Sequence, residues 1–126
     1  MMFLYDSDFS PPAPVLEITV YHPKTADLKT KVRAQLDPGS DISVLPESAA
    51  DAIGLLRDGE LEIESYDGLM ARVPLCVVKL EVAGEMLPPM SVVVMPRSLA
   101  ILGRDVLNNF ILTLNGKDLT FELKDP

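Results

Sequence analysis

Asp37 ends an alternating apolar run and is followed by Pro38, Gly39 and Ser40. A carboxylate held at such a turn can take a proton from water when a second carboxyl group lies close by. The same residues also suit an ordinary β-turn, in which Asp accepts local hydrogen bonds, Pro presets φ and Gly supplies a positive φ. The stretch alone therefore leaves a catalytic carboxylate and a plain turn as alternatives.

The composition narrows the chemistry that the rest of the chain can supply. The chain has 126 residues, of which 48% are hydrophobic, so we expect one domain with a real core. The single histidine, His22, leaves little for a His-based triad or a His-rich metal site. The single cysteine, Cys76, lies in an apolar run and is expected to be a buried core residue. We therefore expect no metal ion, no cofactor and no disulfide.

The net charge of −8 argues against two classes of partner. The basic residues form no block, which disfavours nucleic acid and an anionic membrane surface. No apolar run approaches the roughly 18 residues of a membrane span. The first residues contain Asp6 and Asp8 but no Lys or Arg, which is the wrong charge for a signal peptide. With one cysteine, these features predict a cytoplasmic protein.

Alternation and turn residues predict a mainly β domain over residues 15–126, preceded by an extended, proline-rich arm over residues 1–14. Strands are expected at 15–21 and 28–36, paired as a hairpin, and at 42–45. A short helix is expected from Pro46, with Gly54 just past its end.

Three further hairpins are expected around pairs of turn residues. Asp67-Gly68 lies between two apolar stretches, and Ala83-Gly84 precedes a return strand that Pro88-Pro89 either breaks or places at an edge of the sheet. Asn115-Gly116 is a type I′ signature between the last two strands. Residues 99–110 predict a strand end, a glycine and another short helix. The pattern is typical of a barrel or sandwich.

Two of these motifs together resemble the retropepsin-like aspartic proteases. Asp-x-Gly-Ser at Asp37 is followed about 65 residues later by Ile-Leu-Gly-Arg-Asp, and the resemblance covers roughly residues 15–123. It implies a small closed β-barrel with a flap hairpin and one or two short helices. It also implies hydrolysis of peptide bonds in peptide or protein substrates by two aspartates that share a proton. The chain has one such motif, so a homodimer must supply the second aspartate.

The resemblance assigns roles to further residues. Gly39 lets loops approach closely and leaves its N–H for the carboxylate, and Ser40 can donate to the outer carboxylate oxygen. Gly103 lies beneath the catalytic loop, and Arg104 is a candidate partner of Asp41. The flap, which closes over substrate, corresponds to the hairpin whose tip is Tyr66, Asp67, Gly68, Leu69 and Met70.

Pro38 departs from the family pattern, which has Thr or Ser at this position. In the family, that hydroxyl and backbone N–H interlock with the other subunit, and proline has neither donor. Three hypotheses follow from the sequence. The chain is an aspartic endopeptidase, or it is a catalytically impaired domain of the same fold that acts as a peptide-binding or interaction module, or it is an unrelated β-domain.

Overall fold

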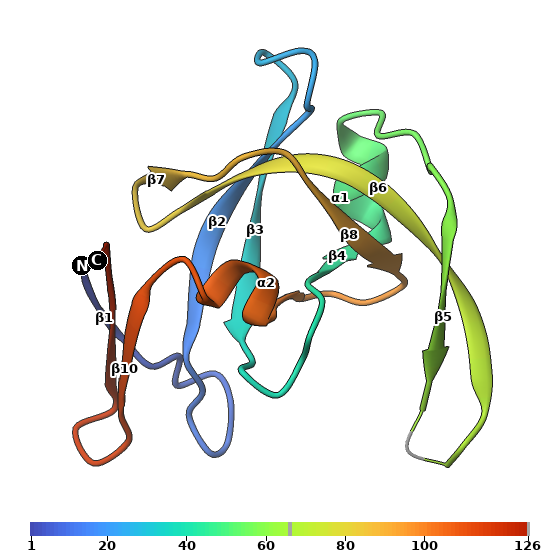
Figure 1. Ribbon diagram of the computed structural model, residues 1–126. Coiled ribbons are helices and arrows are strands. Elements are labelled where there is room, and N and C mark those ends of the chain that lie inside the picture. Colours follow the sequence, from blue (N-terminus) through green and yellow to red (C-terminus); the bar gives the residue numbers. More distant parts are fainter. Residues whose placement is uncertain (66, 126) are drawn as a thin grey trace.

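The computed structural model describes residues 1–65 and 67–125. The regular structure of this part of the chain consists mainly of strands, with two short helices (Figure 1). The strands are β1 Met2–Leu4, β2 Val15–Tyr21, β3 Lys29–Leu36, β4 Val44–Pro46, β5 Glu60–Glu64, β6 Met70–Val82, β7 Glu85–Met86, β8 Met90–Met95, β9 Ala100–Leu102, β10 Ile111–Asn115 and β11 Thr120–Lys124. The helices are α1 Glu47–Ala52 and α2 Arg104–Leu107. The predicted fold class, mainly β with two short helices, is confirmed.

The larger sheet closes on itself. Its strands run in the order β2-β3-β9-β4-β8-β6-β5, and β2 also pairs with β6, which completes a ring of six strands. The β3–β9 and β4–β8 pairs are parallel, whereas β4 meets β9 through one residue pair, Val44 with Ile101. The ring is therefore an irregular barrel, weakest where β4 and β9 meet.

Apolar side chains fill this ring. Val92, Val93 and Val94 of β8 are all buried, which is typical of a strand covered on both faces. Cys76 is fully buried on β6, and burial raises the pKa of its thiol to about 11. The thiol therefore stays protonated at neutral pH and packs as a small apolar group.

The predicted hairpins form, but one of their turns differs from the prediction. Strands β2 and β3 pair from Val15–Gln35 to Tyr21–Lys29, and β5 pairs with β6 and β10 with β11 as expected. The type I′ turn at Asn115-Gly116 is wrong. The positive φ of 55° falls on Leu119 instead, and the Asn115 side-chain oxygen accepts the Asp118 N–H at 3.0 Å. That bond stabilises a longer loop than the dipeptide alone predicts.

Helix α1 begins one residue later than predicted. Pro46 closes β4 and caps the helix with an extended backbone (φ −60°, ψ 139°). Gly54 follows the helix with a φ of 65°, as a residue past a helix end often does. No helix in the described part of the chain is both long and apolar enough to cross a membrane.

Residues of the N-terminal arm join a second sheet, ordered β1-β11-β10. Strand β1 pairs with β11, and the Phe3 ring stacks on Phe121 with 5.1 Å between ring centroids. Tyr5 also packs on Phe121, and an ion pair joins Asp6 to Arg33 of β3. The start of the chain lies beside the end of β11 (Figure 1), where the Met1 amino group donates to the Leu123 carbonyl at 2.8 Å. Residues 1–6 therefore contribute packing and pairing to the body.

Candidate functional site

The loop between β3 and β4, residues 37–43, is called the Asp37 loop below. It opens with a β-turn in which the Ser40 N–H donates to the Asp37 carbonyl at 3.0 Å, with Pro38 and Gly39 at the central positions. The Gly39 N–H donates to Asp37 Oδ1 at 3.0 Å, as the sequence predicts. Gly39 does not have the positive φ expected of it. A side chain there would instead crowd the carboxylate, because a Cβ would lie 3.1 Å from Asp37 Oδ1.

A second segment, Leu102 to Asp105, lies directly against this loop. The Asp37 N–H donates to the Leu102 carbonyl at 2.9 Å, and the Arg104 N–H donates to the Ser40 carbonyl at 2.8 Å. Gly103 is the point of closest approach, since a Cβ on it would lie 2.8 Å from the Ser40 carbonyl oxygen. Its φ of −88° is open to any residue, so glycine is required here for space.

Two side chains of the site have partners that differ from the predicted ones. Arg104 donates from Nη1 to the Pro38 carbonyl at 2.8 Å and forms no ion pair with Asp41, which is exposed. The Ser40 hydroxyl donates to the Ile42 carbonyl at 2.7 Å instead of to the Asp37 carboxylate. Both bonds satisfy backbone carbonyls of the tight loop. The Arg104 side chain therefore stabilises the Asp37 loop by bonding to a backbone carbonyl of that loop.

Ser43 and Asp105 form a contact that the sequence reasoning missed. The Ser43 N–H donates to Asp105 Oδ2 at 2.9 Å and its hydroxyl donates to Asp105 Oδ1 at 2.6 Å. Ser43 is buried, with 2% of its surface exposed. A polar residue inside the apolar run from Ile42 to Leu45 was the available signal, because a buried hydroxyl needs a partner.

The tip of the β5–β6 hairpin, Ser65 to Leu69, is held by bonds within itself. The Gly68 N–H donates to the Ser65 carbonyl at 2.9 Å, and the Leu69 N–H donates to Asp67 Oδ1 at 3.1 Å. The Ser65 hydroxyl also donates to Asp67, and these two bonds lower the pKa of that carboxyl group. Leu69 and Met70 are exposed, by 68% and 57%. Tyr66, also predicted as a contact, lies outside the described residues.

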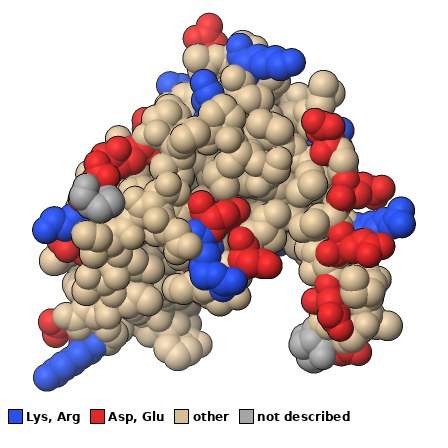
Figure 2. Space-filling model, viewed as in Figure 1, with Lys and Arg blue, Asp and Glu red and all other residues tan. Residues whose placement is uncertain are grey.

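The hairpin projects from the body and leaves a hollow beside it. Figure 2 shows this hollow and the acidic side chains gathered over the hairpin, where Glu60, Glu62 and Glu64 are exposed. In the same view of Figure 1, the β3–β4 connection lies on the body's side of the hollow. The predicted site residues therefore come from two walls, the body and the hairpin, with open space between them.

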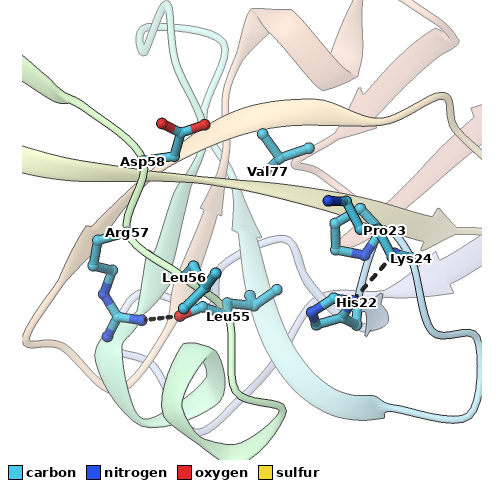
Figure 3. A pocket seen from close by; sticks show the side chains of 8 residues that line it. All are labelled: His22, Pro23, Lys24, Leu55, Leu56, Arg57, Asp58 and Val77. Carbon is cyan, nitrogen blue, oxygen red and sulfur yellow. Dashed lines mark hydrogen bonds between the residues drawn. The ribbon is translucent and has the colours of Figure 1, made fainter.

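A cavity of about 370 Å³ lies elsewhere, at the base of the hairpin (Figure 3). Its walls come from the β2–β3 turn, the segment after α1, and β6, and none of the predicted site residues lines it. The lining residues are His22, Pro23, Lys24, Leu55, Leu56, Arg57, Asp58 and Val77. Among the residues that the structure describes, no group of three or more His, Cys, Asp or Glu side chains could hold a metal ion.

A family model and several solved structures are similar to this chain. A sequence model of the family described as aspartyl protease matches residues 25–115. A retropepsin-like aspartic protease from Rickettsia conorii has a similar structure, with a TM-score of 0.65, 14% identity, and coverage of 98% of this chain and 88% of that one. No curated protein matches the sequence.

Two viral proteases are also similar in structure. The EIAV protease in complex with the inhibitor HBY-793 has a TM-score of 0.58 and 21% identity, covering 76% of this chain and 86% of its own. The simian foamy virus (mac) protease has a TM-score of 0.54 and 18% identity, covering 75% and 91%. At these identities the likeness concerns the fold.

Proposed function

Since the chain belongs to the aspartyl protease family and has the retropepsin-like fold, we propose that it is a homodimeric aspartic endopeptidase with Asp37 as its catalytic residue. The observation that carries this proposal is the Asp37 loop. The half-buried Asp37 carboxylate accepts a hydrogen bond from the Gly39 N–H, and the loop is hydrogen-bonded to the segment around Gly103. The sequence has no second Asp-x-Gly-Ser motif, so one chain supplies half of a two-carboxylate site.

A second copy would complete the site through a twofold axis, across which each residue faces its own counterpart. Two carboxyl groups a few ångströms apart share one proton, because both cannot ionise so close together. The ionised Asp37 takes a proton from water, and the oxygen of that water attacks the peptide carbonyl carbon. The protonated Asp37 gives its proton to the carbonyl oxygen. Collapse of the tetrahedral intermediate then breaks the C–N bond. The amine takes up the proton that the first Asp37 accepted from water, and the other Asp37 regains a proton from a hydroxyl group of the intermediate.

The β5–β6 hairpin would act as the flap over a peptide or protein substrate. Its exposed Leu69 and Met70 offer apolar contacts, and the hydrogen bonds among its described residues, Ser65 and Asp67 to Leu69, stay within the tip. These residues can therefore move without breaking a hydrogen bond to the Asp37 loop. Closure over a substrate would exclude water from the reacting groups.

Pro38 favours a second candidate function, a catalytically impaired domain that binds peptides in the same hollow. Proline at this position offers a partner subunit neither a backbone N–H nor a hydroxyl. Two copies lack up to four donors, each worth about 0.5–1.5 kcal/mol net in a hydrogen bond. A dimer weakened by this amount would bind peptides without cleaving them efficiently.

A peptide-library cleavage assay across pH, run on the wild type and on Asp37→Asn, separates the two functions. The endopeptidase hypothesis predicts cleavage that is fastest below neutral pH, where the shared proton is present, and that falls by ~10²–10⁴-fold or more in the variant. Asp27→Asn, at an exposed site in the β2–β3 turn, should cleave like the wild type. Peptide binding without cleavage at any pH would support the binding module. Sedimentation that shows only monomer at high micromolar concentration would contradict the dimer.

A further inference from the structure

Ser43 is a fully satisfied polar residue at the end of the Asp37 loop. Its N–H and hydroxyl donate to the two oxygens of Asp105, at 2.9 and 2.6 Å. Its hydroxyl oxygen accepts the Gly103 N–H at 3.0 Å, and its carbonyl accepts the Val93 N–H at 3.1 Å. Every polar group of this buried residue therefore has a partner, and the carboxylate of Asp105 receives two of the four bonds.

The network specifically requires a carboxylate at residue 105. Both bonds from Ser43 end on acceptor oxygens, and only an ionised acid presents two of them in this geometry. Bonds to an ionised acceptor are about twice as strong as neutral ones. The Ser43 hydroxyl also accepts while it donates, so Gly103, Ser43 and Asp105 form a chain in which each bond polarises the next.

The same network fixes the far end of the Asp37 loop. At the near end, the Asp37 N–H donates to Leu102, and in the middle Arg104 bonds to the carbonyls of Pro38 and Ser40. Without the Asp105 carboxylate, Ser43 would keep only its bonds to Gly103 and Val93, and the far end of the loop would be held less tightly. Loop ends that are not tied down can shift, and an error of about 1 Å in a reacting group costs on the order of 100-fold in rate.

We propose that Asp105 is a positioning residue, which holds the Asp37 carboxylate in its reactive place by clamping Ser43 at the end of the loop. The role in catalysis rests on the proposed endopeptidase function, whereas the clamp itself does not. Asp105 is not a second reacting acid within the same chain. Both of its oxygens are engaged by Ser43, and its residue borders a separate cavity with Pro88, Pro89 and Asn109.

Amide hydrogen exchange tests the clamp without any need for activity. In Asp105→Asn, the amides of Asp37, Ser40 and Arg104 should exchange about ten- to a hundredfold faster, as expected for loss of a bond to a charged group. Amides of β2 and β6 should keep their wild-type rates, and Asp27→Asn should change neither set. Unchanged loop rates, or an equal increase over the whole chain, would overturn the proposal.

A second pair of variants protects the test against a failure of Asp105→Asn to fold. Ser43→Thr keeps the hydroxyl, and Ser43→Val has the shape of threonine without a hydroxyl. Only Ser43→Val should therefore speed amide exchange in the Asp37 loop. In the cleavage assay, the clamp predicts a kcat lowered about tenfold or more for Ser43→Val relative to Ser43→Thr, with KM nearly unchanged. Equal kcat per folded dimer in this pair would remove the catalytic role. If the wild type cleaves nothing, the endopeptidase proposal fails while the exchange rates still decide on the clamp.

Discussion

The Asp37 loop and the tip of the β5–β6 hairpin share their local chemistry and differ in what surrounds it. In each, an aspartate Oδ1 accepts the N–H two residues further on, at 3.0 Å for Asp37 and 3.1 Å for Asp67. The hydrogen bonds given for Ser65 and for residues 67–69, the described part of the hairpin tip, stay within that tip. The Asp37 loop is also bonded to a segment more than sixty residues away.

The glycines show the same difference. Gly68 has a φ of 83° and nothing within 4 Å of where its Cβ would lie, so it serves the turn's conformation. Gly103 has an ordinary φ, but backbone atoms surround the place of its Cβ, so it serves packing. The Asp37 loop is thus fixed by tertiary contacts, whereas the described residues of the hairpin tip are bonded to one another. A substrate cleft needs a rigid site for the reacting groups and a segment that can close over the substrate.

Gly103→Ala should have the largest effect, because it disrupts the close packing of Gly103 against the Asp37 loop. The new Cβ would meet the Ser40 oxygen at 2.8 Å and the Ile42 carbonyl atoms at 3.0 Å, and backbone cannot move aside cheaply. We expect a loss of ~1–3 kcal/mol, seen as a Tm lower by roughly 5–15 °C, together with loss of cleavage. Gly116→Ala is the matched control, since nothing lies within 4 Å and its φ is not positive. Equal melting temperatures for the two variants would show that the loop has room to adjust.

The hairpins were predictable because their signals are local. Alternation and turn dipeptides fixed the β2–β3 and β5–β6 pairs, and Pro88-Pro89 separated β7 from β8 as expected. The turn at Asn115 was mistaken, because a side-chain bond to Asp118 outweighed the Asn-Gly preference. Propensity is a weak guide where a side chain offers the backbone another partner.

The supports of Asp37 were predicted less well than its position. The Asp-x-Gly-Ser motif located the loop, and the Gly39 bond to the carboxylate followed from it. The partners of Arg104 and Asp105 lie 66 and 62 residues away, and no local pattern states which of several nearby acceptors a long side chain reaches. Such contacts depend on the packed backbone, which the sequence pattern does not supply.

Pro38→Thr would add hydrogen-bond donors to the Asp37 loop. If proline weakens the dimer, restoring an N–H and a hydroxyl in each copy should tighten the dimer dissociation constant by about tenfold or more. The free energy of unfolding of the monomer should fall by about 0.4–1 kcal/mol, because the unfolded chain gains conformational freedom when proline is replaced. Sedimentation and cleavage of both proteins, side by side, measure the effect. A variant no tighter and no faster than the parent would show that the backbone has adapted to proline.

Leu69→Ser tests whether the tip of the β5–β6 hairpin contacts substrate, and it should leave the fold intact. The side chain is 68% exposed, so the Tm should stay within the small range of surface substitutions. If Leu69 packs on substrate when the hairpin closes, KM should rise roughly ten- to a hundredfold, because about 1.5–3 kcal/mol of side-chain burial is lost. Leu56→Ser, at a leucine that is 82% exposed near the hairpin's base, is the control. The same KM for both variants would place substrate away from the tip.

The smallest effect concerns the bonds inside the tip. The Ser65 hydroxyl, and after it the Leu69 N–H, lower the pKa of Asp67, so the ionised form is the one that the folded tip favours. These bonds are present above the ordinary aspartate range and are lost as pH falls through the lowered pKa.

Carboxyl NMR titration should therefore show Asp67 ionising at a lower pH than in Ser65→Ala, where the pKa moves back toward its ordinary value. The Leu69 amide shift should follow the same titration, while the amides of the Asp37 loop should not respond to it. The Tm should be nearly unchanged by Ser65→Ala at neutral pH, because the bonds of the Ser65 hydroxyl go to Asp67 and Leu69 of the same exposed tip. A response of the Asp37 loop amides with the apparent pKa of Asp67 would show that the two sides are coupled even in the single chain, and the contrast between a fixed and an independent turn would not hold.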